Sequence, residues 1–330
     1  MPIAWSDVAA KSNGGTELLG RKLESLISPE LLDNFQIVIS RLRGELDETK
    51  IRIFWAHDLP DDPESKFLEN GGWRKFHRLV FVSHFQMQTY IKKFDIPWSR
   101  CQVLQNAIVP LTPNPDKDFS TIRLVYHSTP HRGLNILAPV FDKLCETHKD
   151  IHLDVFSSFK LYGWEDNDKN YQPVFQALEA NPQVTNHGTV SNDHIREALQ
   201  NAHIFAYPCT WTETSCLCLM ESMSAGLLCV HPTLGALPET AANWTMQYQW
   251  DETLNRHAGI FYQSLDTAIN LMRDNHSKTQ GQLSSQRAYT NVFYSWELRK
   301  MQWEAFLSSL LGEPREFEKP EEVFTYRASI

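Results

Sequence analysis

The stretch from Phe205 to Glu221, FAYPCTWTETSCLCLME, guides the interpretation of the whole chain. Its first residues continue an apolar run that begins at His203 and has the length and composition of a buried strand. Pro208 ends that run, a polar loop follows, and apolar residues return in a predicted helix with Thr214 or Ser215 as its N-cap. A strand, a short loop and a helix start together predict an anion site, because first-turn N–H groups have no partner within the helix.

Two carboxylates flank the start of this predicted helix. Glu213 lies in the loop, and Glu221 lies two turns inside the helix, about 9 Å further along at ~1.5 Å rise per residue. A carboxylate can accept hydrogen bonds from two hydroxyl groups at once. The separation therefore suits a ligand with a phosphate in the middle and hydroxyl groups at both ends.

The composition is that of a globular protein without a large basic surface. The chain has 330 residues, enough for two domains with separate cores, and 42% of them are hydrophobic and 22% charged. Lysine and arginine number 31 against 40 acidic residues, so the net charge is −9 and we expect no nucleic-acid partner. We also expect a cytoplasmic protein with no transmembrane segment, because the N-terminus lacks a signal pattern and no long apolar stretch occurs.

The cysteines do not indicate a metal site. Six are present and none forms a Cys-x-x-Cys pair. Cys209, Cys216 and Cys218 have a spacing that fits no structural zinc pattern, so we predict reduced cysteines and no metal.

Strand-like and helix-like segments alternate along the chain, which predicts parallel sheets. The segment Val109–Pro115 has three prolines and no periodicity, and it predicts the linker between two domains. We therefore expect an α/β fold with two doubly wound, Rossmann-like domains that face each other across a cleft. The expected domains are 1–112 and 113–294, and 295–330 should form a helix that packs back toward the N-terminal domain, plus a tail. Predicted strands lie at 3–5, 35–39, 51–55, 79–82, 101–104, 122–126, 151–156, 184–186, 203–207 and 227–230, and helices at 18–27, 84–94, 134–148, 174–180, 195–200, 235–239 and 296–311.

The segment around the two glutamates resembles a known donor-binding motif. Glu213 and Glu221 have seven residues between them, as in retaining glycosyltransferases of the GT-B fold, in the family usually numbered four and also called glycosyl transferases group 1. Four other segments are similar to that family's motifs and stand in the family's order: Asn13–Glu17, Gln105–Ile108, Tyr126–Leu134 and Gly235–Glu239. The resemblance covers nearly the whole chain.

The resemblance implies a role for each matching residue in donor binding. Glu213 would contact hydroxyl groups of the donor sugar, Ser215 and Cys216 would supply backbone donors, and Glu221 would accept from the ribose hydroxyls. Gly188 belongs to a segment that resembles the wall of the base site. The implied donor-binding residues are Gly14, Gly15, Ser128, Arg132, Gly188, Glu213, Thr214, Ser215, Cys216, Leu217 and Glu221.

Arg132 is the implied electrostatic catalyst, because a fixed guanidinium stabilises the charge that grows on a departing nucleoside diphosphate without a metal. Many relatives carry a second basic residue where this chain has Ser128, so Arg132 works alone or with help from His127 or His131.

The resemblance adds two residues of the first domain to the catalytic set of Arg132 and Glu213. His57 would lie beside the reacting sugar, and Asp58 would orient its imidazole or act on the acceptor. A purely structural His-Asp pair is the alternative.

The implied function is a retaining, metal-independent glycosyltransferase with a front-face mechanism. It would move a sugar from a UDP-, GDP- or ADP-sugar to a hydroxyl acceptor such as a glycan, with no cofactor besides that co-substrate. The alternative is a non-catalytic nucleotide-sugar or partner-binding module on the same fold, which Ser128 favours.

Two other classes of enzyme fit less well. A nicotinamide-dependent dehydrogenase would need Gly-x-Gly-x-x-Gly spacing, which Asn13–Glu17 lacks. A metal-dependent transferase would use an Asp-x-Asp pair; Asp166-Asn167-Asp168 has that form but lies in a polar run that we predict to be a solvated loop.

Overall fold

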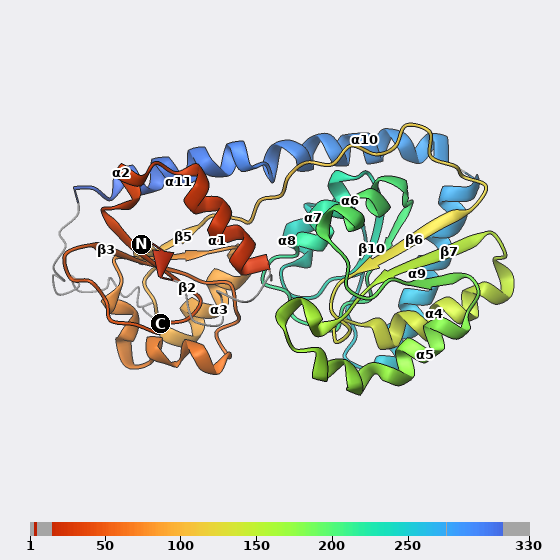
Figure 1. Ribbon diagram of the computed structural model, residues 1–330, viewed down its shortest axis with the longest axis horizontal. Coiled ribbons are helices and arrows are strands. Elements are labelled where there is room, and N and C mark those ends of the chain that lie inside the picture. Colours follow the sequence, from red (N-terminus) through yellow and green to blue (C-terminus); the bar gives the residue numbers. More distant parts are fainter. Residues whose placement is uncertain (1–2, 5–14, 275, 313–330) are drawn as a thin grey trace, which may run out of the picture. The chain divides into compact units, whose positions relative to one another are not determined.

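The computed structural model describes residues 3–4, 15–274 and 276–312, which form two compact units (Figure 1). Unit 1 contains the strand Ile3–Ala4, residues Thr16–Gln105 and the chain from Lys300 on, and unit 2 contains Asn106–Arg299 together with Gly15. The boundary between the units therefore falls inside the last helix, α11 (Trp296–Ser309). Within the described residues, no helix combines the length and the hydropathy that crossing a bilayer requires.

Unit 1 is built on a parallel sheet with the spatial order β1-β2-β3-β4-β5. The strands are β1 (Ile3–Ala4), β2 (Phe35–Ile39), β3 (Ile51–Trp55), β4 (Arg78–Phe81) and β5 (Cys101–Val103), and the helices are α1 (Gly15–Leu26), α2 (Pro29–Leu32) and α3 (His84–Phe94). The described strands lie side by side in chain order. In a doubly wound sheet the chain would return to the free edge of β1, but here β3 pairs with β2 and the later strands continue in the same direction. The expected doubly wound order is thus not found among them.

The central strand of unit 1 is buried on both faces, as its continuous apolar run predicts. Successive side chains of a strand point to opposite faces. Phe54 packs against Phe67 and Phe76, with ring centroids 5.3 and 5.7 Å apart. The next residue, Trp55, packs edge-on against Trp303 of α11, with ring centroids 5.0 Å apart. The residues of α11 from Lys300 on therefore complete the core of unit 1.

Unit 2 contains a six-stranded parallel sheet with the order β11-β10-β9-β6-β7-β8. Its strands are β6 (Ile122–His127), β7 (Ile151–Phe156), β8 (Val184–Asn186), β9 (Ile204–Ala206), β10 (Leu228–Pro232) and β11 (Met246–Tyr248). The chain moves outward from β6 to β8, then returns to β9 on the other side of β6 and continues to β11. This is the doubly wound order that the sequence predicts, and the strand order reverses between β6 and β9.

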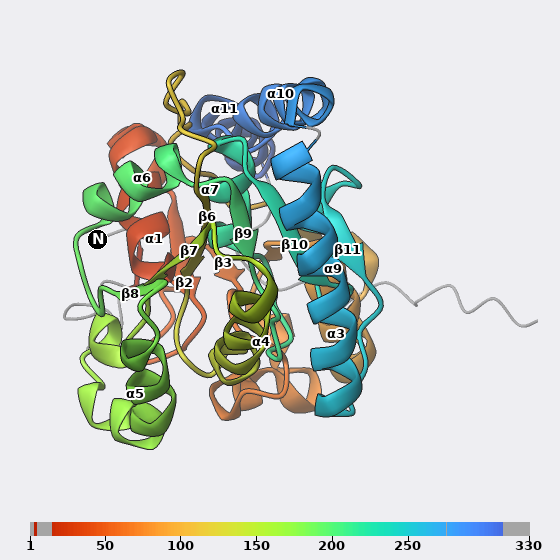
Figure 2. The same cartoon turned by 90° about the vertical axis from the view of Figure 1, so that its right-hand side faces the viewer.

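Helices cover both faces of the unit 2 sheet (Figures 1 and 2). One face carries α4 (Leu134–Thr147), α5 (Gln172–Ala180) and α9 (Leu254–Asp274). The other carries α6 (Asn192–Asn201), α7 (Leu217–Ser224), α8 (Leu237–Ala241) and α10 (His276–Phe293). The α/β class and the parallel sheets are therefore confirmed.

Most predicted elements are present, with ends shifted by a few residues. Helices α2, α9 and α10 and strand β11 are present where the sequence analysis predicts nothing. Strand β11 is only three residues long, and α10 (HSKTQGQLSSQRAYTNVF) is mostly polar and contains a glycine. Helix α9 does carry a local signal, because its buried Phe261, Leu265, Ile269 and Met272 recur at helical spacing, and the sequence analysis missed it.

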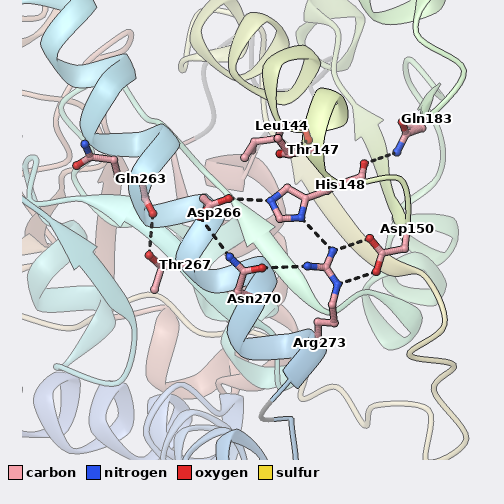
Figure 3. Close-up of polar contacts among 10 residues, drawn as sticks. All are labelled: Leu144, Thr147, His148, Asp150, Gln183, Gln263, Asp266, Thr267, Asn270 and Arg273. Carbon is pink, nitrogen blue, oxygen red and sulfur yellow. Dashed lines mark hydrogen bonds and ion pairs between the residues drawn. The ribbon is translucent and has the colours of Figure 1, made fainter.

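A polar cluster joins α9 to the start of β7 (Figure 3). Arg273 donates to Asp150 through Nε at 2.7 Å and through Nη2 at 2.5 Å, and Nη2 also lies 3.0 Å from His148 Nδ1. Since a guanidinium only donates, Nδ1 must accept, and the hydrogen of His148 lies on Nε2. Nε2 donates to Asp266 at 2.7 Å. The cluster therefore links both ends of the loop between α4 and β7 to one helix.

We expect Arg273→Gln to lower the free energy of unfolding of unit 2 by about 1–2 kcal/mol, because Asp150 and His148 lose their donor at a half-exposed site. Urea denaturation measures this loss. The control is Arg256→Gln on the same helix, whose partner Asp251 lies 3.1 Å away but whose side chain is 70% exposed. Equal losses in the two variants would show that the cluster adds nothing to an ordinary surface pair.

Candidate active site

Three loops of unit 2 meet at the carboxyl ends of β6, β9 and β10. The loop 128–133 follows β6 and the loop 207–216 follows β9, on the two sides of the point where strand order reverses. Ligands of open parallel sheets bind at such a point, because the two connections leave in opposite directions. The Thr210 hydroxyl donates to His131 O at 3.1 Å and ties the first two loops together.

The Glu213 carboxylate lies where these loops converge. Its Oε1 accepts from Arg132 Nη1 at 2.8 Å and from the Tyr207 hydroxyl at 2.6 Å. Glu213 is only 3% exposed. Burial raises the pKa of its carboxyl, whereas the Arg132 guanidinium and the Tyr207 hydroxyl lower it. The ion pair thus brings together two residues that the sequence assigns to separate motifs.

Two glycines allow the loops to approach this closely. Gly133 has φ +101°, and a Cβ there would collide with Pro208 O. Gly235, in the loop after β10, has φ +61°, and a Cβ there would lie 2.6 Å from Glu213 O. The next residue, Ala236, donates its N–H to the same Glu213 oxygen at 2.8 Å. Only glycine accommodates both the left-handed conformation and the contact.

Two helices start at the site, as the sequence predicts, but the cap of the second differs. Helix α4 begins directly after Gly133, and α7 begins at Leu217 with Cys216 at the N-cap and no side-chain cap. The predicted caps, Thr214 and Ser215, are therefore wrong, because Cys216, with extended backbone, takes the N-cap position. The first-turn N–H groups of α7 have no side-chain cap, which suits an anionic ligand.

Glu221 is the fifth residue of α7, about one turn inside and not two. It is half-buried, and no described residue donates a hydrogen bond to its carboxylate. Burial raises the pKa of the Glu221 carboxyl, while the His127 imidazole opposes this rise. His127 itself is held by Ser222, with Nε2 2.9 Å from Oγ.

Four buried polar atoms on these loops and beside them have no hydrogen-bond partner among the described residues. They are Thr129 Oγ1, His131 Nδ1, Ser157 Oγ and Ser215 Oγ. Buried polar atoms in folded proteins nearly always have a partner. Four of them at neighbouring strand ends indicate that a polar ligand binds there. Burial also lowers the pKa of His131 to about 4, so its imidazole is neutral at neutral pH.

The other residues predicted for donor binding lie around this centre or outside it. Ser128 is half-buried directly after β6, and Gly188 follows β8 with φ +61° and open space beside it. The Leu217 side chain packs with Met220 and Tyr294, so only its backbone is available to a ligand. Gly15 is the first residue of α1, and Gly14 lies outside the described residues.

His57 and Asp58 lie in unit 1, at the carboxyl end of β3. His57 is 8% exposed beside the Trp55 ring, and burial lowers its pKa to about 3, so the imidazole is neutral at neutral pH. The Asp58 carboxylate lies 4.0 Å from Arg41 Nε. Burial raises the pKa of Asp58 despite that guanidinium.

The described residues contain no group of three or more His, Cys, Asp or Glu side chains arranged to hold a metal ion. The Asp-x-Asp sequence is not a simple solvated loop, because it lies in a 3-10 segment, Glu165–Tyr171. Asp168 accepts from the Phe159 N–H at 2.8 Å and from the Ser158 hydroxyl. Its role in the structure is to hold that turn.

The sequence analysis missed one residue of the site, Tyr207, which it interpreted as the last apolar residue of a strand. A signal was available. A tyrosine hydroxyl that is buried at a strand end needs an acceptor, and Glu213 is the nearest carboxylate in the sequence.

Comparisons with known proteins agree with this picture. Residues 113–257 match the model of the family described as Glycosyl transferases group 1. The phosphatidylinositol N-acetylglucosaminyltransferase gpi3 subunit of Schizosaccharomyces pombe is 24% identical over 168 residues, which are 49% of this chain and 35% of that protein. The GPI3 subunit of the Saccharomyces cerevisiae enzyme is 22% identical over 230 residues, which are 66% of this chain and 48% of that protein. The two matches therefore span less than half of the length of either relative.

Solved structures share the fold. A glycosyltransferase from Rickettsia africae has a TM-score of 0.65 at 14% identity and covers 92% of this chain and 84% of its own. Anabaena HepE in complex with UDP-glucose has a TM-score of 0.64 at 15% identity, with 89% and 82% covered.

The matched segment contains Arg132, Glu213 and Glu221, and with them the loops after β6, β9 and β10. The resemblance that the motifs carry is therefore confirmed at the level of family and fold. Residues 113–257 match the glycosyl transferases group 1 family, and the chain has the fold of the GT-B glycosyltransferases.

Proposed function

We propose that this protein transfers a sugar from a nucleoside diphosphate sugar to a hydroxyl group of an acceptor, with retention of anomeric configuration and without a metal ion. The observation that carries the proposal is the Arg132–Glu213 ion pair, which lies between the N-termini of α4 and α7. A cation and two helix starts suit a diphosphate, and a buried carboxylate beside them suits sugar hydroxyls.

Each part of the donor has a group suited to it. The diphosphate lies against Arg132 and the backbone N–H groups of Ser215 and Cys216. Glu213 accepts from a hydroxyl of the sugar, and Glu221, which has no donor among the described residues, accepts from the ribose. The base lies beside Gly188, where the His187 ring stacks on Phe156 with centroids 4.3 Å apart.

The chemistry follows from the charge that develops as the donor breaks. When the bond to the anomeric carbon cleaves, its electron pair stays on the diphosphate, and Arg132 and the two helix starts stabilise the charge. The leaving phosphate oxygen then removes the proton of the acceptor hydroxyl. Because the acceptor attacks from the side that the diphosphate leaves, configuration is retained.

The resemblance adds roles for two further residues, His57 and Asp58. The neutral imidazole of His57 hydrogen-bonds a hydroxyl of the reacting sugar, and Asp58 acts on the acceptor, which we take to be a glycan. Solved relatives guide the choice of donor, since HepE was solved with UDP-glucose and the pneumococcal O-GlcNAc transferase GtfA with UDP and GlcNAc. UDP-sugars are therefore the first donors to test.

We expect one nucleoside diphosphate among UDP, GDP and ADP, with its sugars, to raise the unfolding temperature clearly. A ligand at 100 times its dissociation constant stabilises by about 2.7 kcal/mol. EDTA should not change the shift, and Glu221→Ala should remove it. Glu179→Ala, an exposed acid of α5, should keep it. No shift with any nucleotide, or a shift with NAD alone, would contradict the proposal, and binding without turnover would favour the non-catalytic alternative.

We expect Arg132→Gln to lower kcat about 10²–10³-fold, because the departing diphosphate loses its fixed cation. The measurement is release of nucleoside diphosphate from the donor that gives the largest thermal shift. Arg123→Gln is the control, since Arg123 lies on β6, the strand before the Arg132 loop, is 48% exposed, and pairs with Asp154 at 3.8 Å. A wild-type kcat for Arg132→Gln would show that this guanidinium does not stabilise the leaving group.

A further inference from the structure

The Tyr207 hydroxyl is the second donor to the buried Glu213 carboxylate. It lies 2.6 Å from Glu213 Oε1, a length typical of a charge-assisted O–H···O bond. Among the described residues, the other contacts of this oxygen are Arg132 Nη1 at 2.8 Å and the Cys209 thiol at 3.9 Å. A thiol at that distance is a weak donor. Tyr207 is therefore the strong donor to Glu213 that carries no charge.

Tyr207 is also fixed more firmly than Arg132. It is fully buried, its N–H donates to Val230 O at 3.0 Å, and its ring stacks on Phe205 with centroids 5.1 Å apart. The Arg132 side chain is 23% exposed and sits on a loop between β6 and α4. Of the two donors to Oε1, the tyrosine is the one that cannot easily move.

The two donors, Arg132 and Tyr207, behave differently when a ligand binds. In the proposed function, Arg132 interacts with the diphosphate, so its single contact with Glu213 weakens or is shared. Glu213 would then be a buried carboxylate with less compensation, free to turn about its side-chain torsions. A rigid neutral donor that keeps hold of Oε1 prevents this. It also leaves Oε2, to which no described residue donates a hydrogen bond, directed at the ligand.

We propose that Tyr207 is a positioning residue that holds Glu213 Oε1 when Arg132 turns to the diphosphate, so that Oε2 receives the donor sugar. The inference rests on the proposed function and deepens it. It assigns no contact between Tyr207 and substrate, since the hydroxyl acts through Glu213 alone.

The test compares Tyr207→Phe with Tyr294→Phe. Tyr294 is equally buried in unit 2, and its hydroxyl donates to Thr240 O at 2.9 Å, away from Glu213. Each substitution removes one hydroxyl and keeps the ring. We expect Tyr207→Phe to lower kcat/KM for the nucleotide sugar about tenfold or more, the scale of a hydrogen bond to a charged group. Affinity for the nucleoside diphosphate without its sugar should change less than about twofold, because Glu213 binds the sugar side.

A double-mutant cycle with Glu213→Gln shows whether Tyr207 acts through Glu213. The effect of Tyr207→Phe should largely vanish in the Glu213→Gln background, whereas that of Tyr294→Phe should stay the same. The acid limb of the kcat/KM profile should also move to higher pH in Tyr207→Phe, since the hydroxyl favours the ionised carboxylate. The titratable and charged groups that interact with Glu213 are Tyr126, Arg132, Tyr207, Cys209, Cys216 and Cys218, and of these only Tyr207 changes.

Two outcomes would overturn the inference while leaving the proposed function intact. In one, the wild type is active and Tyr207→Phe and Tyr294→Phe have the same kcat/KM for the nucleotide sugar. The other is equal weakening of nucleotide sugar and nucleoside diphosphate in Tyr207→Phe, which indicates general damage. A wild type that neither binds nor turns over any nucleotide sugar would instead overturn the proposed function, and the inference with it.

Discussion

A carboxylate that is removed from water needs donors to compensate its charge, and Glu213 finds its two strong donors on the loop after β6 and at the end of β9. Arg132 comes from the loop after β6, Tyr207 from the end of β9, and the Ala236 N–H, from the loop after β10, holds the Glu213 backbone. Arg132 and Tyr207 compensate the charge, and the Ala236 contact fixes the backbone that carries it. The position of one buried side chain therefore constrains the geometry of the whole carboxyl edge of the unit 2 sheet.

The sheet supplies the conditions for this convergence. Strand order reverses between β6 and β9, so the two connecting helices, α4 and α7, start on opposite faces and present their N-termini to the same region. Gly133 and Gly235 then permit backbone contacts that a Cβ would block. Farther from the site, the Arg273 cluster ties α9 to the loop that precedes β7, which fixes the opposite edge of the same sheet.

The two glutamates of the motif, Glu213 and Glu221, have different environments in the structure. Glu213 is fully buried with two strong donors, whereas Glu221 is half-buried and has none among the described residues. The first is pre-positioned by the protein, and the second is open to a ligand. His57 is likewise pre-set as a neutral imidazole by burial in unit 1, which suits a hydrogen-bonding role better than a charged one.

The sequence by itself determined the α/β class, the parallel sheets, most strand positions and the set of motifs around Glu213, Glu221 and Arg132. It could do so because buried strands are continuous apolar runs and helix starts carry local signals. It did not determine that Arg132 forms an ion pair with Glu213, that Tyr207 donates a hydrogen bond to the same carboxylate, or that α7 begins only at Leu217. It also predicted neither α10 nor the chain-order sheet of unit 1. These features depend on which strands become neighbours, and hydrogen bonds between residues about 80 positions apart leave no trace in local periodicity. Only the tertiary structure decided them.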